Sequence, residues 1–186
     1  MDMLIVGTQS ESFKTPLTVS QSRCQFSVWS ALKSPLLVSA DFTNFNVTPA
    51  MIDVLKNAEV LAVSDDPLGR EAVRLEDQPG STSVGEIYAG PLANGSYVVV
   101  FFNRYDKAAN MSLHLADVVP QSLGASSSLS SSSMWAVRDL WAHADNGTVA
   151  RDGHIDLTIP PEDVVMIKLT PSTNVGGAHA SWALWW

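Results

Sequence analysis

Met3-Leu4-Ile5-Val6-Gly7 is a short, continuously apolar stretch that ends at a glycine. An unbroken apolar run of this length is typical of a parallel strand that is buried on both faces. A second run of the same kind follows later in the chain, at Leu36-Leu37-Val38-Ser39-Ala40. We therefore predict that the N-terminal part begins with two parallel strands.

Helices are predicted between and after these strands. Thr18-Val19-Ser20-Gln21 has the pattern of a capping box, and the helix that it starts is expected to run to about Lys33, before Ser34-Pro35 stops it. Thr48-Pro49 predicts the start of another helix, with threonine as the cap and proline at the first position. The resulting order, β-α-β-α, is the unit of parallel α/β folds, but two such units do not close a barrel.

The pattern changes after Asp65-Asp66-Pro67-Leu68-Gly69. Two strands at 86–88 and 97–102, joined by a turn at Ala93-Asn94-Gly95, predict a hairpin. Further strands are expected at 111–115, 135–141, 154–159 and 164–169, with a serine-rich loop at 126–133. These strands indicate an antiparallel β-sandwich. The expected domains are 1–70, 71–171 and an unassigned tail at 172–186. The three tryptophans of the tail are consistent with an added strand or a partner patch, but a disordered end or an error in the gene model is favoured.

Composition excludes several classes of protein. The chain has 186 residues, 46% of them hydrophobic and 16% charged, and its formal net charge is −8. An acidic chain repels phosphate backbones and anionic lipids, so we expect neither nucleic-acid binding nor membrane docking, whereas a neutral sugar fits this charge. The single cysteine, Cys24, forms no internal disulfide and no cysteine-based zinc site. It reads as a small core residue, with a reactive thiol as the alternative.

The sequence also carries signals about compartment. No apolar run approaches the length of a membrane span, and the first residues lack the pattern of a secretory leader. Glycosylation sequons begin at Asn46, Asn94, Asn110 and Asn146. Because such sites matter only on the secretory route, they favour a secreted or lysosomal origin.

Few residues suggest chemistry by pattern alone. The four histidines lack metal-ligand spacing, and no phosphate-binding loop or Gly-x-Ser-x-Gly elbow occurs, so no metal or cofactor is predicted. Asp41 follows the second strand at its carboxyl end, where β/α barrels place their chemistry, and a structural role for it is equally consistent. Asp2 precedes the first strand, so pattern favours a solvated loop acid there.

Several segments nevertheless resemble glycoside hydrolase family 27, the α-galactosidases and α-N-acetylgalactosaminidases. Asp2-Met3-Leu4-Ile5-Val6-Gly7 resembles the family's strand seven, without the Gly-Gly-Trp-Asn-Asp-Pro stretch that normally precedes it. Residues 26–37 resemble helix seven and strand eight, and 59–69 the barrel-closing segment, with Ser64-Asp65 in place of Asn-Gln. Segments 89–92, 102–104, 137–141 and 161–171 resemble the C-terminal sandwich. The resemblance covers about residues 2–171.

The resemblance implies the last two β/α units of a (β/α)₈ TIM barrel followed by a C-terminal antiparallel β-sandwich. It also implies retaining hydrolysis of terminal α-galactosides, by two aspartates on earlier strands that lie upstream. This chain alone is therefore expected to be inactive and to hold no catalytic residue. Asp2 and Met3 are the implied substrate-binding residues: the aspartate hydrogen-bonds sugar hydroxyls and the methionine lines the pocket. No metal or cofactor is implied, and the location is secreted or lysosomal/vacuolar.

Alternatives to an enzyme fragment stay open. One is a non-enzymatic β-sandwich module that binds carbohydrate or a partner, and another is a degenerate structural protein. Galactose and N-acetylgalactosamine both remain as sugars, since the loop that discriminates them lies upstream, and oligomerisation is undecided. A quarter of a barrel leaves the inner faces of its strands uncovered, so we expect residues 1–70 to be unstable or to aggregate alone.

Overall fold

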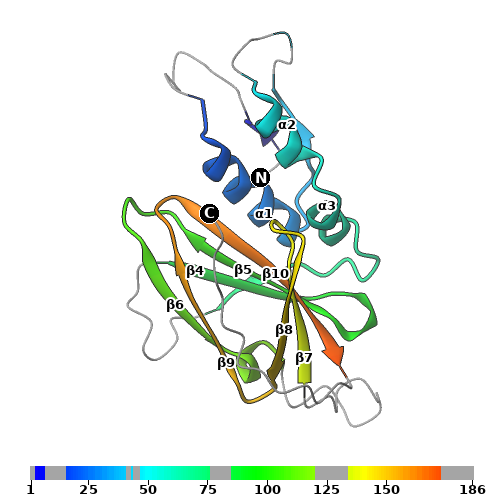
Figure 1. The fold of residues 1–186 in the computed structure, drawn as a ribbon. Helices are drawn as coiled ribbons and strands as arrows, with labels where there is room; N and C mark the ends of the chain where they lie inside the picture. Colours follow the sequence, from blue (N-terminus) through cyan, green and yellow to red (C-terminus); the bar gives the residue numbers. More distant parts are fainter. Residues whose placement is uncertain are drawn as a thin grey trace.

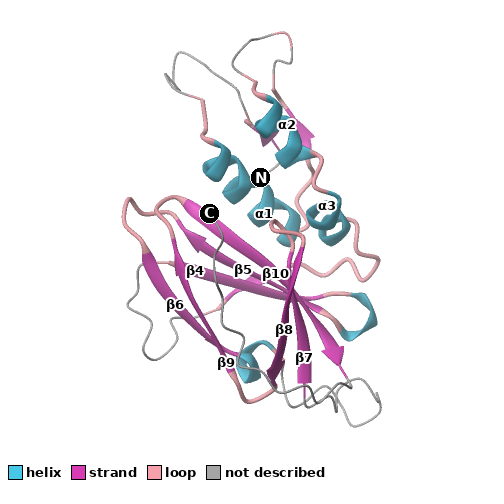
Figure 2. Cartoon of the chain, viewed as in Figure 1, coloured by secondary structure: helices cyan, strands magenta, loops and turns pink. Residues whose placement is uncertain are grey.

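The computed structural model describes residues 3–6, 16–40, 43, 47–75, 85–119 and 134–172. A group of helices lies at one end of the molecule, above a larger part built of strands (Figures 1 and 2). The elements in chain order are β1 (Met3–Leu4), α1 (Val19–Ala31), β2 (Leu37–Val38), α2 (Pro49–Leu55), α3 (Ala58–Ser64), β3 (Val73–Arg74), β4 (Glu86–Pro91), a 3₁₀ turn (Ala93–Gly95), β5 (Tyr97–Asn103), β6 (Ala109–His114), α4 (Leu115–Val118), β7 (Met134–Asp139), β8 (Ala144–Ala150), β9 (His154–Ile159) and β10 (Asp163–Ser172). None of the helices in these ranges is long and apolar enough to cross a membrane.

The expected N-terminal elements are confirmed. Strands β1 and β2 pair in parallel, with Met3 opposite Leu37. Helix α1 starts at the predicted capping box, in which Gln21 N–H donates to Thr18 Oγ1 at 3.2 Å and Thr18 N–H donates to Gln21 Oε1 at 2.9 Å. Thr48 caps α2 and Pro49 opens it. The β-α-β-α order is therefore present.

The C-terminal part is the predicted sandwich. One sheet has six strands in the order β3-β4-β5-β10-β7-β8, and the other is the pair β6-β9; every pairing within them is antiparallel. Trp135, Phe101 and Ile167 of the larger sheet lie in one buried cluster with Leu113 and Ile155 of the smaller one. The space between the two sheets is thus one hydrophobic core.

A second core lies on the opposite face of the six-stranded sheet. Phe26 and Val28 of α1 are buried in one cluster with Val98, Val100 and Met166 of β5 and β10. Helix α1 therefore covers the outer face of this sheet while β6 and β9 cover the inner face. Because burial of apolar side chains is the main stabilising term, this second core joins the helices to the sandwich.

Four short elements were not predicted. Helix α3 begins at Asn57, whose Oδ1 accepts hydrogen bonds from Glu59 N and Val60 N, and its seven residues are too few for a clear helical period. Strand β8 contains Asp145-Asn146-Gly147, a turn-like sequence, and Gly147 has a φ of +80°. Edge position and cross-strand pairing, rather than composition, make this segment a strand. Strand β3 and helix α4 are shorter still.

An ionic cluster also joins the helices to the sandwich. Arg138 of β7 binds Glu59 of α3 through two contacts, Nε to Oε2 at 2.6 Å and Nη2 to Oε1 at 2.7 Å. His143 Nδ1 lies 2.7 Å from Glu59 Oε1, and Arg138 Nη1 lies 2.9 Å from Asp145 Oδ1. The hydrogen bond from Arg138 is the main cause that holds the pKa of Glu59 below its ordinary value of 4.5.

Asn103 is the main polar link inside the sandwich. Its side chain is fully buried at the end of β5, and its Nδ2 donates to the carbonyl oxygens of Lys107, Ile159 and Pro160 at 2.7, 3.2 and 2.7 Å. Its Oδ1 accepts from Tyr105 N–H at 3.1 Å. The amide thereby fixes the loop after β5 against the connection from β9 to β10.

Asn103→Asp should strongly destabilise the chain. A carboxylate cannot donate to three carbonyl oxygens, and it would bury a charge beside them, so we expect a loss of about 3 kcal/mol or more in the free energy of unfolding. Urea denaturation measures this loss. The matched control is Asn110→Asp on β6, where the exposed side chain accepts a hydrogen bond from Thr158 Oγ1, as a carboxylate also can, so stability should change by about 0.5 kcal/mol or less. Equal losses in both variants would contradict the role assigned to Asn103.

The Glu59 cluster should make stability depend on pH. A carboxyl whose folded pKa is lowered stabilises the fold above its unfolded pKa of about 4.5, and that contribution is lost as pH falls through the lowered folded pKa. Glu59→Gln should therefore lower the denaturation midpoint at pH 7, and its difference from the unmodified chain should shrink below about pH 4.5. Asp53→Asn serves as the control, because the Asp53–Lys56 pair is exposed and local, joining α2 to its own C-cap residue. A pH-independent difference for Glu59→Gln would be inconsistent with this contribution.

Candidate functional site

The predicted substrate-binding residues lie at the start of the chain. Met3 is the first residue of β1 and is 54% exposed to solvent. Asp2 and Asp41 lie outside the described residues, so their expected positions stay predictions. Directly after Met3, Leu4 is completely buried. Strand β1 thus presents Met3 outward and anchors itself through the next side chain.

Gln25 of α1 holds β1 in place. Its Nε2 donates to the carbonyl oxygen of Met3 at 3.1 Å, and its Oε1 accepts from Ile5 N–H at 3.0 Å. On the other side of the strand, Ser39 donates to the carbonyl oxygen of Leu4 through both its N–H and its Oγ, at 3.0 and 2.9 Å. Met3 is therefore carried on a backbone that is fixed from two directions. Sequence reasoning missed Gln25, because nothing in the local pattern distinguishes it from an ordinary helix residue.

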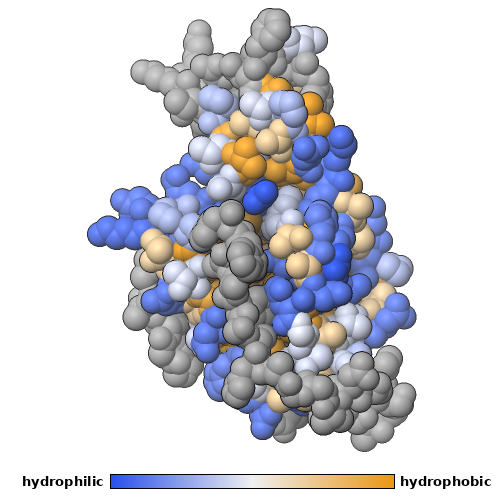
Figure 3. All heavy atoms as spheres, viewed as in Figure 1, coloured by the Kyte–Doolittle hydropathy of each residue, from blue (hydrophilic) through white to orange (hydrophobic). Residues whose placement is uncertain are grey.

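The parallel pair leaves apolar surface uncovered. Leu37 and Val38 of β2 are 57% and 45% exposed, and they lie opposite Met3 and Leu4 in the register. In the space-filling view, much of the strongly hydrophobic surface on the face shown lies over the helical part (Figure 3). Parallel sheets normally have both faces covered, so this exposed pair has the character of an incomplete sheet.

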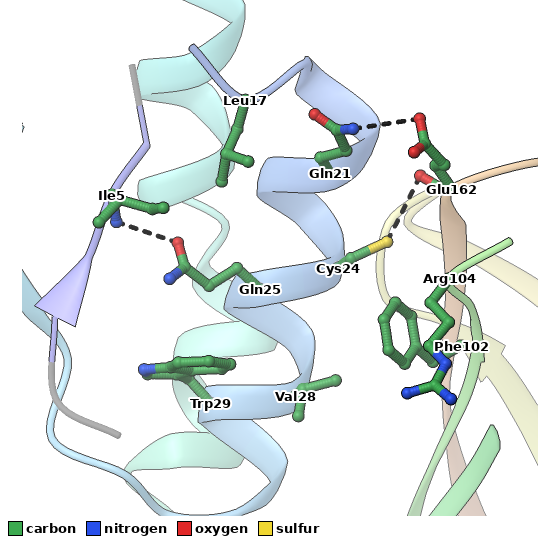
Figure 4. A pocket seen from close by; sticks show the side chains of 10 residues that line it. All are labelled: Ile5, Leu17, Gln21, Cys24, Gln25, Val28, Trp29, Phe102, Arg104 and Glu162. Atoms are coloured by element: carbon green, nitrogen blue, oxygen red, sulfur yellow. Dashed lines mark hydrogen bonds between the residues drawn. The ribbon is translucent and has the colours of Figure 1, made fainter. Parts of the chain in front are cut away.

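An apolar cavity of about 370 Å³ lies beside β1 (Figure 4). It is lined by Ile5, which directly follows β1, by Leu17, by Val28 and Trp29 of α1, and by Phe102 of β5. Among the described residues, the buried indole Nε1 of Trp29 has no hydrogen-bond partner. The cavity can receive an apolar group.

The polar residues of this cavity lie mainly between α1 and the sandwich. Gln21 Nε2 donates to Glu162 Oε2 at 3.1 Å, and Cys24 Sγ lies 3.6 Å from the carbonyl oxygen of Glu162 (Figure 4). Arg104 pairs with Glu86 at 3.4 Å. Burial raises the pKa of the Cys24 thiol to about 12, so the thiol stays protonated and is a poor nucleophile. The expected core role of Cys24 is confirmed by its 6% exposure.

The histidines serve structural contacts. His114 and His154 stack across β6 and β9 with ring centroids 4.6 Å apart, and His143 contacts Glu59. Within the described ranges, no group of three or more histidine, cysteine, aspartate and glutamate side chains could hold a metal ion. His179 lies outside these ranges.

Known proteins resemble this chain in both sequence and structure. Residues 83–169 match the family model described as the alpha galactosidase C-terminal beta sandwich domain. An α-galactosidase of Oryza sativa subsp. japonica is 31% identical over 171 residues, which cover 92% of this chain and 35% of that protein. The chain thus spans about a third of the length of this curated relative.

Solved structures give the same result. The α-galactosidase I of Mortierella vinacea has a TM-score of 0.73 and 31% identity, covering 92% of this chain and 40% of that one. A GH27 β-L-arabinopyranosidase of Geobacillus stearothermophilus has a TM-score of 0.72 at 23% identity, covering 94% and 37%, and at that identity it shows the fold alone. On these similarities, residues 83–169 belong to the C-terminal β-sandwich domain of the α-galactosidase family, and the chain as a whole is related to the C-terminal portion of the α-galactosidases of glycoside hydrolase family 27.

Proposed function

We propose that this chain is the C-terminal portion of a retaining α-galactosidase, which as a whole protein hydrolyses terminal α-galactosides. In that enzyme, the chain would complete the barrel and supply the substrate contacts Asp2 and Met3. Its sandwich would stabilise the barrel and the position of these two residues. The two catalytic aspartates belong to upstream strands. The chain alone is therefore expected to be inactive.

The observation that carries this proposal is the exposed parallel pair of β1 and β2. Met3, Leu37 and Val38 are apolar and more than 40% exposed, although parallel strands are normally covered on both faces. Strand β1 pairs only with β2 among the described strands, and on its other edge the Met3 carbonyl and the Ile5 N–H are bonded to the Gln25 side chain. An upstream β/α unit would cover the exposed apolar face of this parallel pair.

The cavity beside β1 supports the same arrangement. Ile5, Leu17, Val28 and Trp29 give it an apolar wall, and Ile5 directly follows β1. In a β/α barrel, the helix that follows a strand packs on the outside, next to the helices of the neighbouring units. A helix of the preceding unit would therefore fill this cavity.

The chemistry expected of the whole enzyme is the retaining scheme. One carboxylate attacks the anomeric carbon, and the other acts first as acid and then as base, with the two about 5 Å apart. Asp2 would hydrogen-bond sugar hydroxyls, and Met3 would line the pocket. Gln25 is a positioning residue in this proposal, since it holds the carbonyl of Met3 and the N–H of Ile5.

A secreted or lysosomal/vacuolar location is part of the proposal. Asn94 and Asn110 begin two of the sequons, and both lie in exposed positions, at the 3₁₀ turn and on β6. Exposed sequons are usable only by proteins on the secretory route.

Immunodepletion from the source cells tests the proposal. An antibody raised against residues 85–172 should remove the hydrolysis of p-nitrophenyl α-galactoside from the extract, whereas pre-immune serum should leave it. The captured species should have an intact mass well above the 20.0 kDa of this chain, since a barrel of about 250 residues accompanies the sandwich. A captured species of 20 kDa, with hydrolysis left in the supernatant, would overturn the proposal.

A further inference from the structure

A second groove, of about 410 Å³, lies between the helices and the sandwich, away from β1. Its walls come from α1, from α2 and the turn that follows it, and from the segment after β7. The lining residues are Arg23, Ala50, Asp53, Val54, Lys56, Asn57, Ala58, Trp141 and His143. This volume is at the lower end of the range of small-molecule sites, and it is enough for one sugar ring.

The lining combines an apolar surface with a polar border. Trp141, Val54 and the two alanines supply the apolar part, while Arg23, Asp53, Lys56 and His143 supply hydrogen-bond donors and acceptors. A pyranose has the matching character, because its ring carries an apolar C–H face and a border of hydroxyls that both donate and accept. We propose that this groove is a non-catalytic binding site for a single neutral pyranose.

The aromatic wall of the groove is held rigidly. Trp141 Nε1 donates to the buried Ser27 Oγ at 2.9 Å, and Trp141 N–H donates to Asp139 Oδ1 at 2.8 Å. The ring of Phe26 lies 6.4 Å from that of Trp141. Asn57 Nδ2 donates to the carbonyl oxygen of Leu140 at 2.9 Å, which ties the turn after α2 to the same segment. A wall fixed in this way loses little entropy on binding.

The charges favour a neutral ligand over an anion. Arg23 and Lys56 are cationic, but Asp53 lies 3.7 Å from Lys56 and Glu59 contacts His143. A sulfate or phosphate would meet these carboxylates, whereas sugar hydroxyls can donate to Asp53 and accept from the two cations. The guanidinium of Arg23 lies 5.3 Å from the Trp141 ring, and its buried Nε has no hydrogen-bond partner among the described residues. Arg23 is therefore a donor that a ligand hydroxyl near this wall could satisfy after a small adjustment of the side chain.

The proposed site is separate from the proposed hydrolysis. All of its lining residues belong to the described part of this chain, and none is Asp2 or Met3. Binding of a sugar here requires neither the catalytic aspartates nor the upstream barrel. Failure of sugar binding at this groove and failure of the proposed hydrolysis are therefore distinguishable, since each is tested by a separate experiment.

The test is a titration of the ¹⁵N-labelled 186-residue chain with D-galactose, followed by NMR. We expect saturable shifts of the Trp141 indole and of the Asp53 and Lys56 amides, with a dissociation constant on the order of 1 to 10 mM. The Trp135 indole, buried between the sheets, should stay unchanged as an internal reference. D-glucose and sodium sulfate are titrated in parallel.

Two variants connect the shifts to the groove. Asp53→Ala and Lys56→Ala should each weaken galactose binding by about fivefold or more, because each removes a charged hydrogen-bonding group. Both side chains are at least 70% exposed, so the fold should be unaffected. Asp117→Ala on α4 is the matched control at an exposed acid outside the groove, and its affinity should be unchanged.

Three results would overturn the proposal. The first is the absence of saturable shifts for galactose and glucose up to about 100 mM, a concentration well above the expected dissociation constant. The second is tighter binding of sulfate than of either sugar at the same resonances, which would make the groove an anion site. The third is equal affinity in Asp53→Ala, Lys56→Ala and the unmodified chain, which would place the sugar elsewhere.

Discussion

Strands β5 and β10 lie side by side within the six-stranded sheet, and both of their faces are buried. Alternate side chains of β5 serve different cores: Val99 and Phe101 face the sandwich interior, while Val98 and Val100 face α1. Neither core can form without these two strands. The packing of the helices, the core of the sandwich and the surface around Met3 all depend on this burial of both faces.

Polar contacts then set the geometry that apolar packing alone leaves loose. Asn103 fixes two loops of the sandwich through its buried amide, and the Glu59–Arg138 pair links α3 to β7. Gln25 completes the connection by holding β1 on α1. Through these successive contacts, the sandwich supports the strand that carries Met3. In the proposed enzyme, the β domain would thereby contribute to the sugar site of the barrel.

Local patterns predicted the elements whose periods and caps were distinct. The capping box at Thr18, the Thr48-Pro49 helix start and the parallel pair could all be predicted, because short-range chemistry determines them. Helix α3 and strand β8 were missed, since tertiary contacts stabilise them against a weak local signal. The continuous apolar run of β5 is consistent with burial on both faces, but the pattern alone predicts only a strand of a sandwich. Gln25 acts through long-range contacts, which a single sequence does not reveal.

The central claim is that the helices and the sandwich form one cooperative unit through the core that α1 shares with β5 and β10. Native-state hydrogen exchange tests it most directly, by comparing the amides of Phe26 and Val28 with those of Val98 and Val100. One shared free energy of opening, equal to that of global unfolding, is the predicted result. Exchange of the α1 amides through an opening of much lower free energy, with β5 still protected, would contradict the claim. The helices would then be a loosely attached layer.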